Sequence, residues 1–463
     1  MSYTFIFLHR RLCRTFPGWI GIPALLALLL ISPACWAGPD PVLSLSEAVR
    51  TALRTNPGIS SSMEDVRSRK EGVGISKAMY FPTLSVSYQN TVGNGFMGFF
   101  LFPNYNSYDF ELLTVTLTED IWDFGRREAA TSQNRWAMRK ALDHHRRTLQ
   151  EIIHKTEVAY YLLLSTQHQE AASRLAFRDT LRHLDTARLL YKKGKILHPA
   201  LTAAEETVEE SRLALFQAID RRRESQAVLA RLLGVTPIDH PVRALDLPFI
   251  PNDQPIRLRR DVSLALRSRP DLQEMSDEVK ARKAALDKAR DDNLPIFSAV
   301  GQYFLTQLPY GALPMPVVPQ NSAFFSTYNV GGLLTIPVFE GGSTLHRWRQ
   351  ARARFQSTHF KMDDAKLRVE KEVIQSSLRV GETRQKWVAA IEGLETAREN
   401  IVRVKERLFE GKASPLDALD ARAAFEKAKA EAMAARYAWA TALADYRFVL
   451  GDIRPPQPPQ ISP

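Results

Sequence analysis

Apolar residues from Leu416 to Leu443 recur at three-, four- and seven-residue steps, as packed helices require. Two earlier stretches also suit long helices. Arg126–Lys193 contains neither glycine nor proline, and Ser343–Glu410 contains no proline and few glycines. The pattern predicts two helical hairpins, at about 124–233 and about 341–450, with helices far longer than the usual globular helix.

The two hairpins are predicted to turn at matching positions, and the match extends beyond the turns. The turn residues are Gly194, Lys195, Gly411 and Lys412. Ahead of the hairpins, Ala48–Ile59 resembles Val262–Gln273 at an offset of about 215 residues. Landmarks in one order and at one spacing indicate a duplicated unit, with a first repeat at 38–260 and a second at 261–451.

Strictly alternating apolar and polar residues precede each hairpin. They predict four strands, at about 82–92, 112–121, 295–307 and 325–339. Each run has about the length that a tilted strand needs to cross a bilayer. Aromatic-rich segments between the strands, such as Phe96–Tyr108, are expected to form loops at the membrane interface. The fold class is therefore mixed α and β, mainly α.

Four strands are too few for a barrel with an aqueous lumen, because barrel diameter grows with strand number. An open sheet edge is not viable in lipid. If these strands lie in a membrane, several chains must share one barrel, and three chains would supply twelve strands. In a soluble protein the same apolar faces would instead cover a core.

The N-terminal residues predict export. Arginines precede an apolar run, Ile22–Ile31, that is too short to span a bilayer, so 1–37 is expected to be a signal peptide. Both cysteines, Cys13 and Cys35, fall within it, which excludes disulfides and cysteine metal sites from the mature chain. No later apolar stretch is long enough for a transmembrane helix. A periplasmic, secreted or outer-membrane protein remains.

Charge and motifs argue against nucleic acid and against catalysis. The formal net charge is +11, but the basic residues alternate with acidic ones along the helices, as on a solvated face, so no nucleic-acid partner is expected. Gly93–Gly98 matches a dinucleotide pattern but lacks a following helix. Asp143, His144 and His145 could suggest a metal site, but adjacent residues of a helix point in different directions and rarely share an ion. We expect no enzyme, no catalytic or metal residues and no cofactor.

Asp417 and Asp420 are the candidate functional carboxylates. They lie three residues apart at the start of a predicted helix and so share nearly one face. Carboxylates in a first turn simply favour the helix dipole. In a symmetric oligomer, however, the same spacing stacks two carboxylate rings, which bind cations and have raised pKa values through mutual repulsion. The sequence alone does not decide between these two interpretations.

Several segments together resemble the TolC-like outer-membrane efflux proteins. They are LSLSEAVRTALRTNPGI after the signal, the strand ends DIWDFGRRE and PVFEGG, and GKASPLDALDARAAFEKAKAE. The resemblance spans Leu43–Leu450. It implies a homotrimeric channel-tunnel, with a twelve-stranded barrel in outer-membrane lipid and a long periplasmic α-helical barrel. Such a duct is passive and serves tripartite efflux or type I secretion.

The resemblance also implies partners and site residues. A periplasmic adaptor would grip the tips at Gly194-Lys195 and Gly411-Lys412, and an inner-membrane pump would supply the energy. Asp417 and Asp420 would ring the periplasmic entrance. The segment 235–260 and the proline-rich tail 452–463 would form a belt around the tunnel.

Two departures put the family's usual closing network in question, since the tip carries Leu408 and Ala413 where the family pattern has tyrosine and arginine. Lys412 or His198 is the expected substitute. The alternative function is a periplasmic coiled-coil scaffold or adaptor without a membrane barrel. Such a protein would remain in solution without detergent.

Overall fold

The computed structural model describes residues 42–99, 102–236, 242–246, 255–307 and 324–453. The predicted signal peptide and most of the proline-rich tail lie outside these residues. Within the described part of the chain, no helix combines the length and apolar character needed to cross a membrane.

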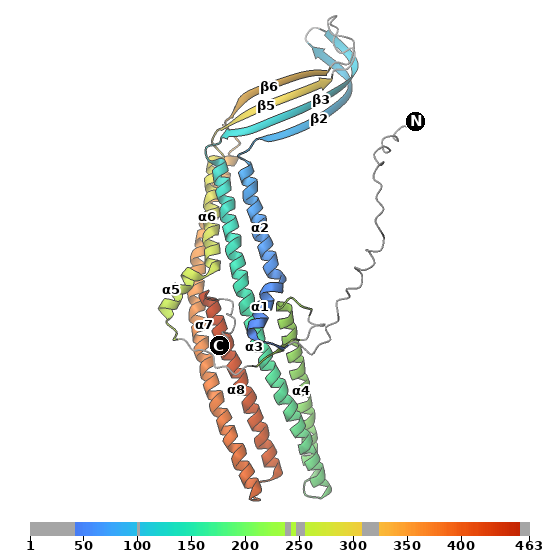
Figure 1. Cartoon of the computed structure of the whole chain (residues 1–463), viewed down its shortest axis with the longest axis vertical. Helices are drawn as coiled ribbons and strands as arrows, with labels where there is room; N and C mark the ends of the chain where they lie inside the picture. The colour runs from blue at the N-terminus through green and yellow to red at the C-terminus, as the bar shows by residue number, and fades with distance from the viewer. Residues whose placement is uncertain (1–41, 100–101, 237–241, 247–254, 308–323, 454–463) are drawn as a thin grey trace, which may run out of the picture. The chain divides into compact units, whose positions relative to one another are not determined.

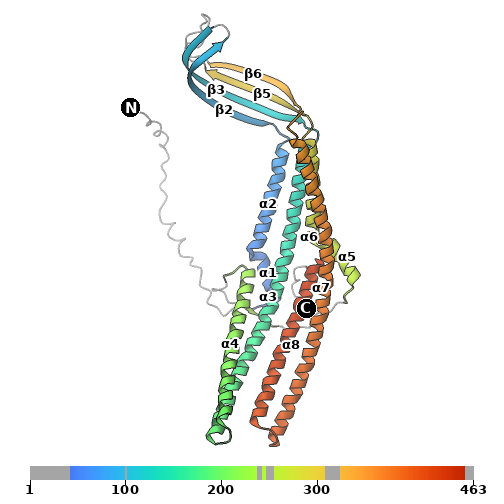
Figure 2. The ribbon, with the colours of Figure 1, turned by 180° about the vertical axis from the view of Figure 1, so that it is seen from behind.

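Two long helical hairpins dominate the fold (Figures 1 and 2). The first pairs α3 (Arg126–Lys192) with α4 (His198–Leu232), and the second pairs α7 (Ser343–Phe409) with α8 (Pro415–Leu450). Both α3 and α7 have 67 residues, as expected from stretches with no proline. The hairpins pack together through α3 and α8.

Four shorter helices were not predicted. They are α1 (Leu45–Thr55), α2 (Pro57–Ala78), α5 (Leu258–Ser268) and α6 (Pro270–Asp291). In each repeat a proline opens the second helix of the pair, because its fixed φ suits the first helical position. Both α2 and α6 pack against α3, which extends the helical layer toward the strands.

Each hairpin ends against the proline junction of its own repeat. Gly234 follows α4 with φ +68°, and a Cβ there would lie 2.5 Å from the carbonyl oxygen of Thr55. Gly451 follows α8 with φ +73° and lies similarly against Arg269. The Thr55 hydroxyl donates to the Leu233 carbonyl at 2.5 Å. At the second junction the Ser268 hydroxyl donates in the same way to the Leu450 carbonyl, at the end of α8. The duplication therefore includes the packing between elements.

The strands form one antiparallel sheet in the order β2-β3-β5-β6. Their bounds are Thr83–Phe99 for β2, Phe102–Trp122 for β3, Ile296–Gln307 for β5 and Phe324–Thr335 for β6. In the described residues β2 and β6 pair with one neighbour each. The sheet therefore has two free edges.

The first two strands are longer than expected. The segment Phe96–Tyr108 was expected to be a loop, but its described residues continue the β2–β3 ladder as far as Phe99 opposite Phe102. Phenylalanine and tyrosine favour extended backbone, so an established register continues through them. The glycine motif Gly93–Gly98 lies inside β2, and no helix follows it directly. At the other edge, β6 ends four residues earlier than expected, before Pro337, which lacks a ladder donor.

Apolar residues on alternate positions of the edge strands are open to solvent in the single chain. Leu84, Val86 and Tyr88 of β2 are 62–68% exposed, and Tyr328 and Val330 of β6 are about 80% exposed. A face of this composition must meet either another protein or lipid.

The main hydrophobic core lies where the two repeats meet at mid-height. Tyr160 and Leu163 of α3 are buried there with Leu229 of α4 and Tyr437 of α8. Two short parallel strands, β1 (Val42–Leu43) and β4 (Arg243–Ala244), attach to this core. The Tyr160 hydroxyl donates to the carbonyl of Leu43 in β1 at 2.9 Å and to that of Leu245, just after β4, at 2.8 Å.

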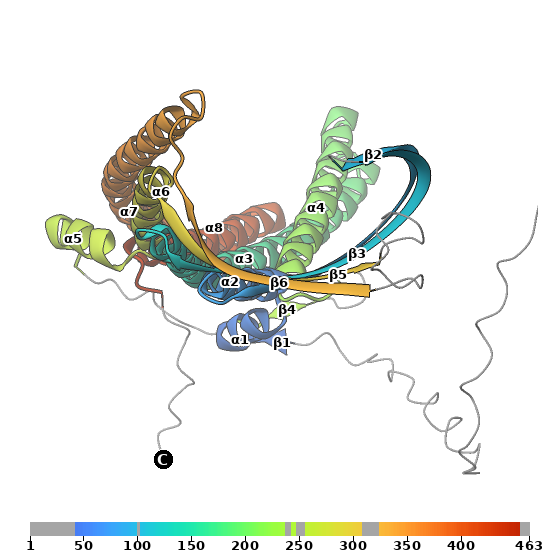
Figure 3. The same cartoon turned by 90° about the horizontal axis from the view of Figure 1, so that it is seen from above.

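Asp246, next to β4, ties the segment to both hairpins. Its carboxylate accepts from the Tyr437 hydroxyl at 2.6 Å and from Arg436 at 3.0 Å, and it pairs with His168 of α3 at 2.8 Å. Seen from above, α4, α3, α8 and α7 follow an arc, and α1 and α5 lie on its outer side (Figure 3).

Candidate functional site

The two hairpin tips have the same backbone. Gly194 and Gly411 have φ values of +68° and +73°, and their amides donate back to the last turns of α3 and α7. The residues that start the return helices, Leu197 and Ser414, both have φ −86° and ψ 159°. Glycine is needed at both turns because left-handed backbone is costly for other residues.

The tips differ in how the return helix is capped. Leu197 makes no side-chain cap on α4 and is 79% exposed. Ser414 forms a capping box on α8: its hydroxyl accepts from the Asp417 amide at 3.1 Å, and the Asp417 carboxylate accepts from the Ser414 amide at 2.7 Å. The Asp417 side chain is therefore fixed by the N-terminal cap of α8.

Asp417 and Asp420 are both exposed at the start of α8. The hydrogen bonds from the Ser414 backbone and side chain lower the pKa of the Asp417 carboxyl. Within one chain this is the reverse of the rise expected for a ring of carboxylates, because the cap acts on the charged form directly. Asp417 thus stabilises the start of α8 within the single chain.

The expected substitutes for the closing network remain within their own hairpins. The Lys412 amine lies 2.9 Å from Glu410 of the same tip. The His198 ring meets Tyr191 edge to face, with centroids 5.8 Å apart. Neither contact joins one hairpin to the other.

An ionic contact between the hairpins lies deeper. Arg422 of α8 lies 3.7 Å from Asp179 of α3, which is 6% exposed and is also 3.3 Å from Arg182 of its own helix. The Asp179 oxygen facing Arg422 accepts no hydrogen bond within the described residues. Sequence reasoning missed this pair, because nothing in the spacing of 179 and 422 links two charges so far apart.

Adjacent polar residues of α3 point to different helices, as expected from their spacing. The His144 ring lies 3.2 Å from Glu274 of α6, and His145 lies 2.8 Å from Ser62 of α2. Burial lowers the pKa of His145, with a further contribution from the charge of His144. No group of three or more potential metal ligands occurs among the described residues.

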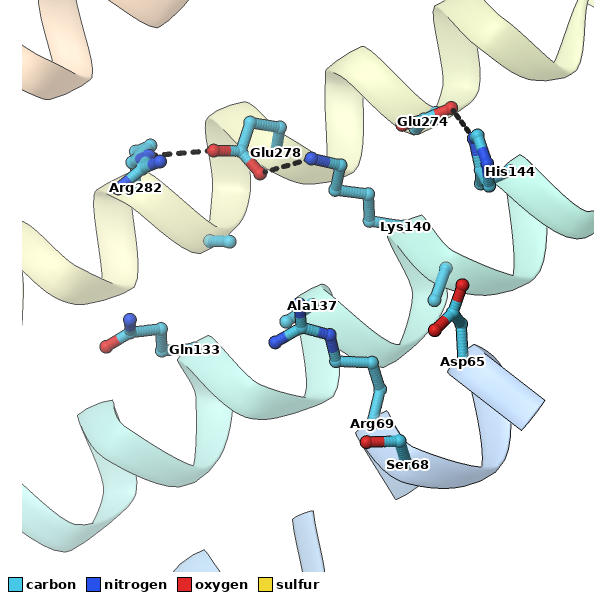
Figure 4. A pocket seen from close by; sticks show the side chains of 12 residues that line it. Asp65, Ser68, Arg69, Gln133, Ala137, Lys140, His144, Glu274, Glu278 and Arg282 are labelled. Atoms are coloured by element: carbon cyan, nitrogen blue, oxygen red, sulfur yellow. Dashed lines mark hydrogen bonds and ion pairs between the residues drawn. The ribbon is translucent and has the colours of Figure 1, made fainter. Parts of the chain in front are cut away.

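A polar cavity lies between α2, α3 and α6 (Figure 4). Its volume is about 690 Å³. Glu278 accepts from both Lys140 and Arg282 along one wall, while Arg69 projects from α2 on the other. The side chains form ion pairs across the helices, and no nucleophile with an adjacent base is present among them.

The chain is similar to a known protein family and to two known proteins. A family model described as outer membrane efflux protein matches residues 48–235 and 262–452. The alkaline protease secretion protein AprF of Pseudomonas aeruginosa is 24% identical over 429 residues, covering 88% of this chain and 84% of AprF. Protein CyaE of Bordetella pertussis is 25% identical over 346 residues, covering 72% of this chain and 69% of CyaE.

Solved structures show the same fold. The CmeC outer membrane channel of Campylobacter jejuni superposes with a TM-score of 0.75 at 16% identity, over 88% of this chain and 85% of CmeC. The open state of the MtrE outer membrane channel of Neisseria gonorrhoeae gives a TM-score of 0.69 at 17% identity, over 88% of each chain.

Proposed function

The chain belongs to the outer membrane efflux protein family and is a passive exit duct of the outer membrane that extends into the periplasm, and we propose that three copies build that duct. The observation that carries the assembly is the sheet, whose β2 and β6 edges are free. Lipid offers no partner for unpaired backbone groups, so each edge needs a neighbouring chain. Three four-stranded sheets close into twelve strands.

The helices support the same assembly. Exposed apolar residues of α7 recur at multiples of seven, which is the period of a seam between packed helices. Six of the nine exposed large apolar residues of α7 follow this period: Phe360, Leu367, Ile374, Val388, Val402 and Phe409. The other three, Leu345, Leu378 and Ile391, do not. At the tip, Phe409 is 95% exposed, an extreme value for phenylalanine at a surface that meets only water. We assign this seam to contact with the next copy.

Disulfide cross-linking tests the assembly. Both natural cysteines precede the described chain, so any disulfide within it must join introduced cysteines. Within one chain β3 and β5 separate β2 from β6 by about 14 Å, too far for a disulfide. We expect Ser85→Cys, combined in turn with Asn329→Cys, Gly331→Cys or Leu333→Cys, to give covalent trimers from at least one pair. Single-cysteine variants are the control. Only monomers from all three pairs would refute the shared sheet.

We further propose that Asp417 and Asp420 form the periplasmic constriction. Both are exposed at the first turns of α8, beside the tip. Three copies would place six carboxylates near the axis, and such rings attract cations. The capping box holds Asp417 in the ionised form that this role needs.

The Asp417→Ala/Asp420→Ala variant should conduct with reduced preference for cations and weaker block by divalent ions. Glu406→Ala/Glu410→Ala removes two carboxylates from the same tip, at the end of α7 and just after it, and should change neither property. Ser414→Ala weakens the cap but keeps both carboxylates, so its selectivity should stay near that of the native protein. Equal selectivity in the native and Asp417→Ala/Asp420→Ala proteins would exclude the constriction.

The partners are a periplasmic adaptor and an energised inner-membrane pump. The exposed tip residues Gly194, Lys195, Gly411 and Lys412 are the proposed contact with the adaptor. A photoreactive residue at Lys195 or Lys412 should capture the adaptor in cells, whereas one at Arg352, far from either tip, should not. Failure at both tips would exclude this contact.

A further inference from the structure

A groove rich in cations lies on α6 and α7 immediately below the sheet. Its charged lining residues are Arg282, Lys288, Asp292, Arg347 and Arg354, and its volume is about 230 Å³. Gln133 and Arg282 also line the cavity of Figure 4, so the two hollows adjoin. The α6 end of the groove stops four residues before β5 begins at Ile296. The groove is therefore at the membrane end of the helices.

Carboxylates do not balance these cations. Asp292 is shared by Lys288 and Arg126, each at 3.2 Å. Glu278 is likewise shared by Arg282 at 2.8 Å and Lys140 at 3.1 Å.

At the α7 side of the groove, Arg347 pairs with Glu340 at 3.4 Å while both side chains remain well exposed. Arg354 has no ion pair among the described residues and is exposed. Two cations for each shared carboxylate, together with an unpaired arginine, leave the groove positive. A concave surface of one sign concentrates the field and raises the local concentration of opposite charge.

The groove faces the inside of the helical layer. On α3 the adjoining cavity is lined by Lys140 and His144. Tyr160, which holds the β1–β4 segment, follows His144 by sixteen residues, about half a turn away around the helix. The cavity and the β1–β4 segment thus lie on opposite faces of α3. Figure 3 shows α1, which follows β1 in the chain, on the outer side of the arc. The opposite face of α3, which lines the cavity, therefore lies on the inner side.

We propose that this groove binds multivalent anionic groups of the exported cargo as they approach the membrane barrel. The inference rests on the proposed duct, in which the inner side of the arc becomes the lumen. Three copies would then set three positive grooves around one passage, beyond the carboxylates of the entrance. Rings of arginine and lysine favour anions in pores, just as carboxylate rings favour cations. Clustered carboxylates of a polypeptide and the phosphates of a small molecule share the required chemistry.

Block of the open duct tests the groove. The full-length protein, reconstituted in a planar bilayer, is titrated with hexaglutamate or with inorganic tripolyphosphate from the side of the sheet. We expect both probes to interrupt the native current at low ionic strength and to lose potency as salt rises. Stronger block by hexaglutamate would assign the site to polypeptide cargo, and stronger block by tripolyphosphate to phosphorylated small molecules.

Matched variants locate the block. Lys288→Gln/Arg354→Gln removes one groove cation from α6 and one from α7, and should raise the half-blocking concentration by about tenfold, since each exposed ionic contact contributes up to about fivefold. Lys283→Gln/Arg352→Gln makes the same change on the same helices outside the groove and should leave block unchanged. Lys288→Arg/Arg354→Lys keeps the charge and should keep the block.

Equal block in the groove and control variants would overturn the assignment, as would native channels that neither anion blocks. Those results leave the duct itself intact. A native protein that forms no channel would instead refute the proposed function, and the inference would fall with it.

Discussion

At the scale of single residues, the Asp246 carboxylate is held by several donors rather than by one partner. Burial alone would raise the pKa of the Asp246 carboxyl, but hydrogen bonds from Tyr437 and His168 and the charge of Arg436 together lower it. The same bonds join β4 to α3 and α8. The carboxylate therefore stabilises the junction of the two hairpins in its ionised form.

A pH-dependent loss of stability follows for Asp246. Because the folded pKa lies below the unfolded value, the stabilisation is present at neutral pH and disappears as pH falls below about 4. Asp246→Asn should cost about 1 kcal/mol at pH 7, a value reduced by solvent screening, and much less at pH 3. Thermal unfolding followed by circular dichroism at both pH values measures this, with the exposed Asp220→Asn as control. An equal cost at both pH values would contradict the ionic role.

At the scale of elements, the sequence predicts what depends on local pattern. The long hairpins follow from stretches with no proline that end at Gly194 and Gly411. In contrast, α2 could not be predicted from apolar periodicity, because its buried face consists of Ser62, Val73 and Ser76. The face that α6 buries is similarly small or charged, including Ala281 and Ala284 with two aspartates. Small residues let these helices approach α3 closely without a hydrophobic signature.

The proline junctions provide a test of inter-element packing. Gly234→Ala combines left-handed backbone with a Cβ 2.5 Å from the Thr55 carbonyl oxygen. We expect a loss of about 2–4 kcal/mol in stability. Gly411→Ala has similar backbone but open space around it, so about 1 kcal/mol is expected. Thermal unfolding compares the two variants, and equal losses would show that the contact with Thr55 does not matter.

The contact between hairpins is a tertiary feature that no local pattern reveals. Asp179 and Arg422 belong to different repeats and become neighbours only when α3 packs on α8. A nearly buried carboxylate that loses a cation is destabilised, so the packing that keeps the tips together should loosen.

Asp179→Ala and Arg422→Ala should each raise the conductance of the resting duct in planar bilayers. The exchanged pair Asp179→Arg/Arg422→Asp should lower it again toward the native value. Arg182→Ala removes the cation that pairs with Asp179 within α3 and should have the smaller effect. No difference between Arg422→Ala and Arg182→Ala would exclude a role for the link between hairpins.

At the scale of the whole molecule, the duplicated unit explains the architecture. Each repeat contributes two strands, a proline junction and a hairpin, and the first core lies where the repeats meet. What remains exposed is consistent with a chain that is one part of a larger assembly: two sheet edges, apolar strand faces and the apolar seam of α7. Charge is then distributed along the proposed passage, with the Asp417 and Asp420 carboxylates at the entrance and the cationic groove below the sheet.

Conductance of the detergent-purified, full-length native protein in a planar bilayer tests the duct most directly. The account predicts long-lived, discrete current steps that favour cations, because every path begins at the Asp417 and Asp420 rings. A folded protein that gives no steps and stays in solution without detergent would contradict it, and would identify the chain as a periplasmic scaffold.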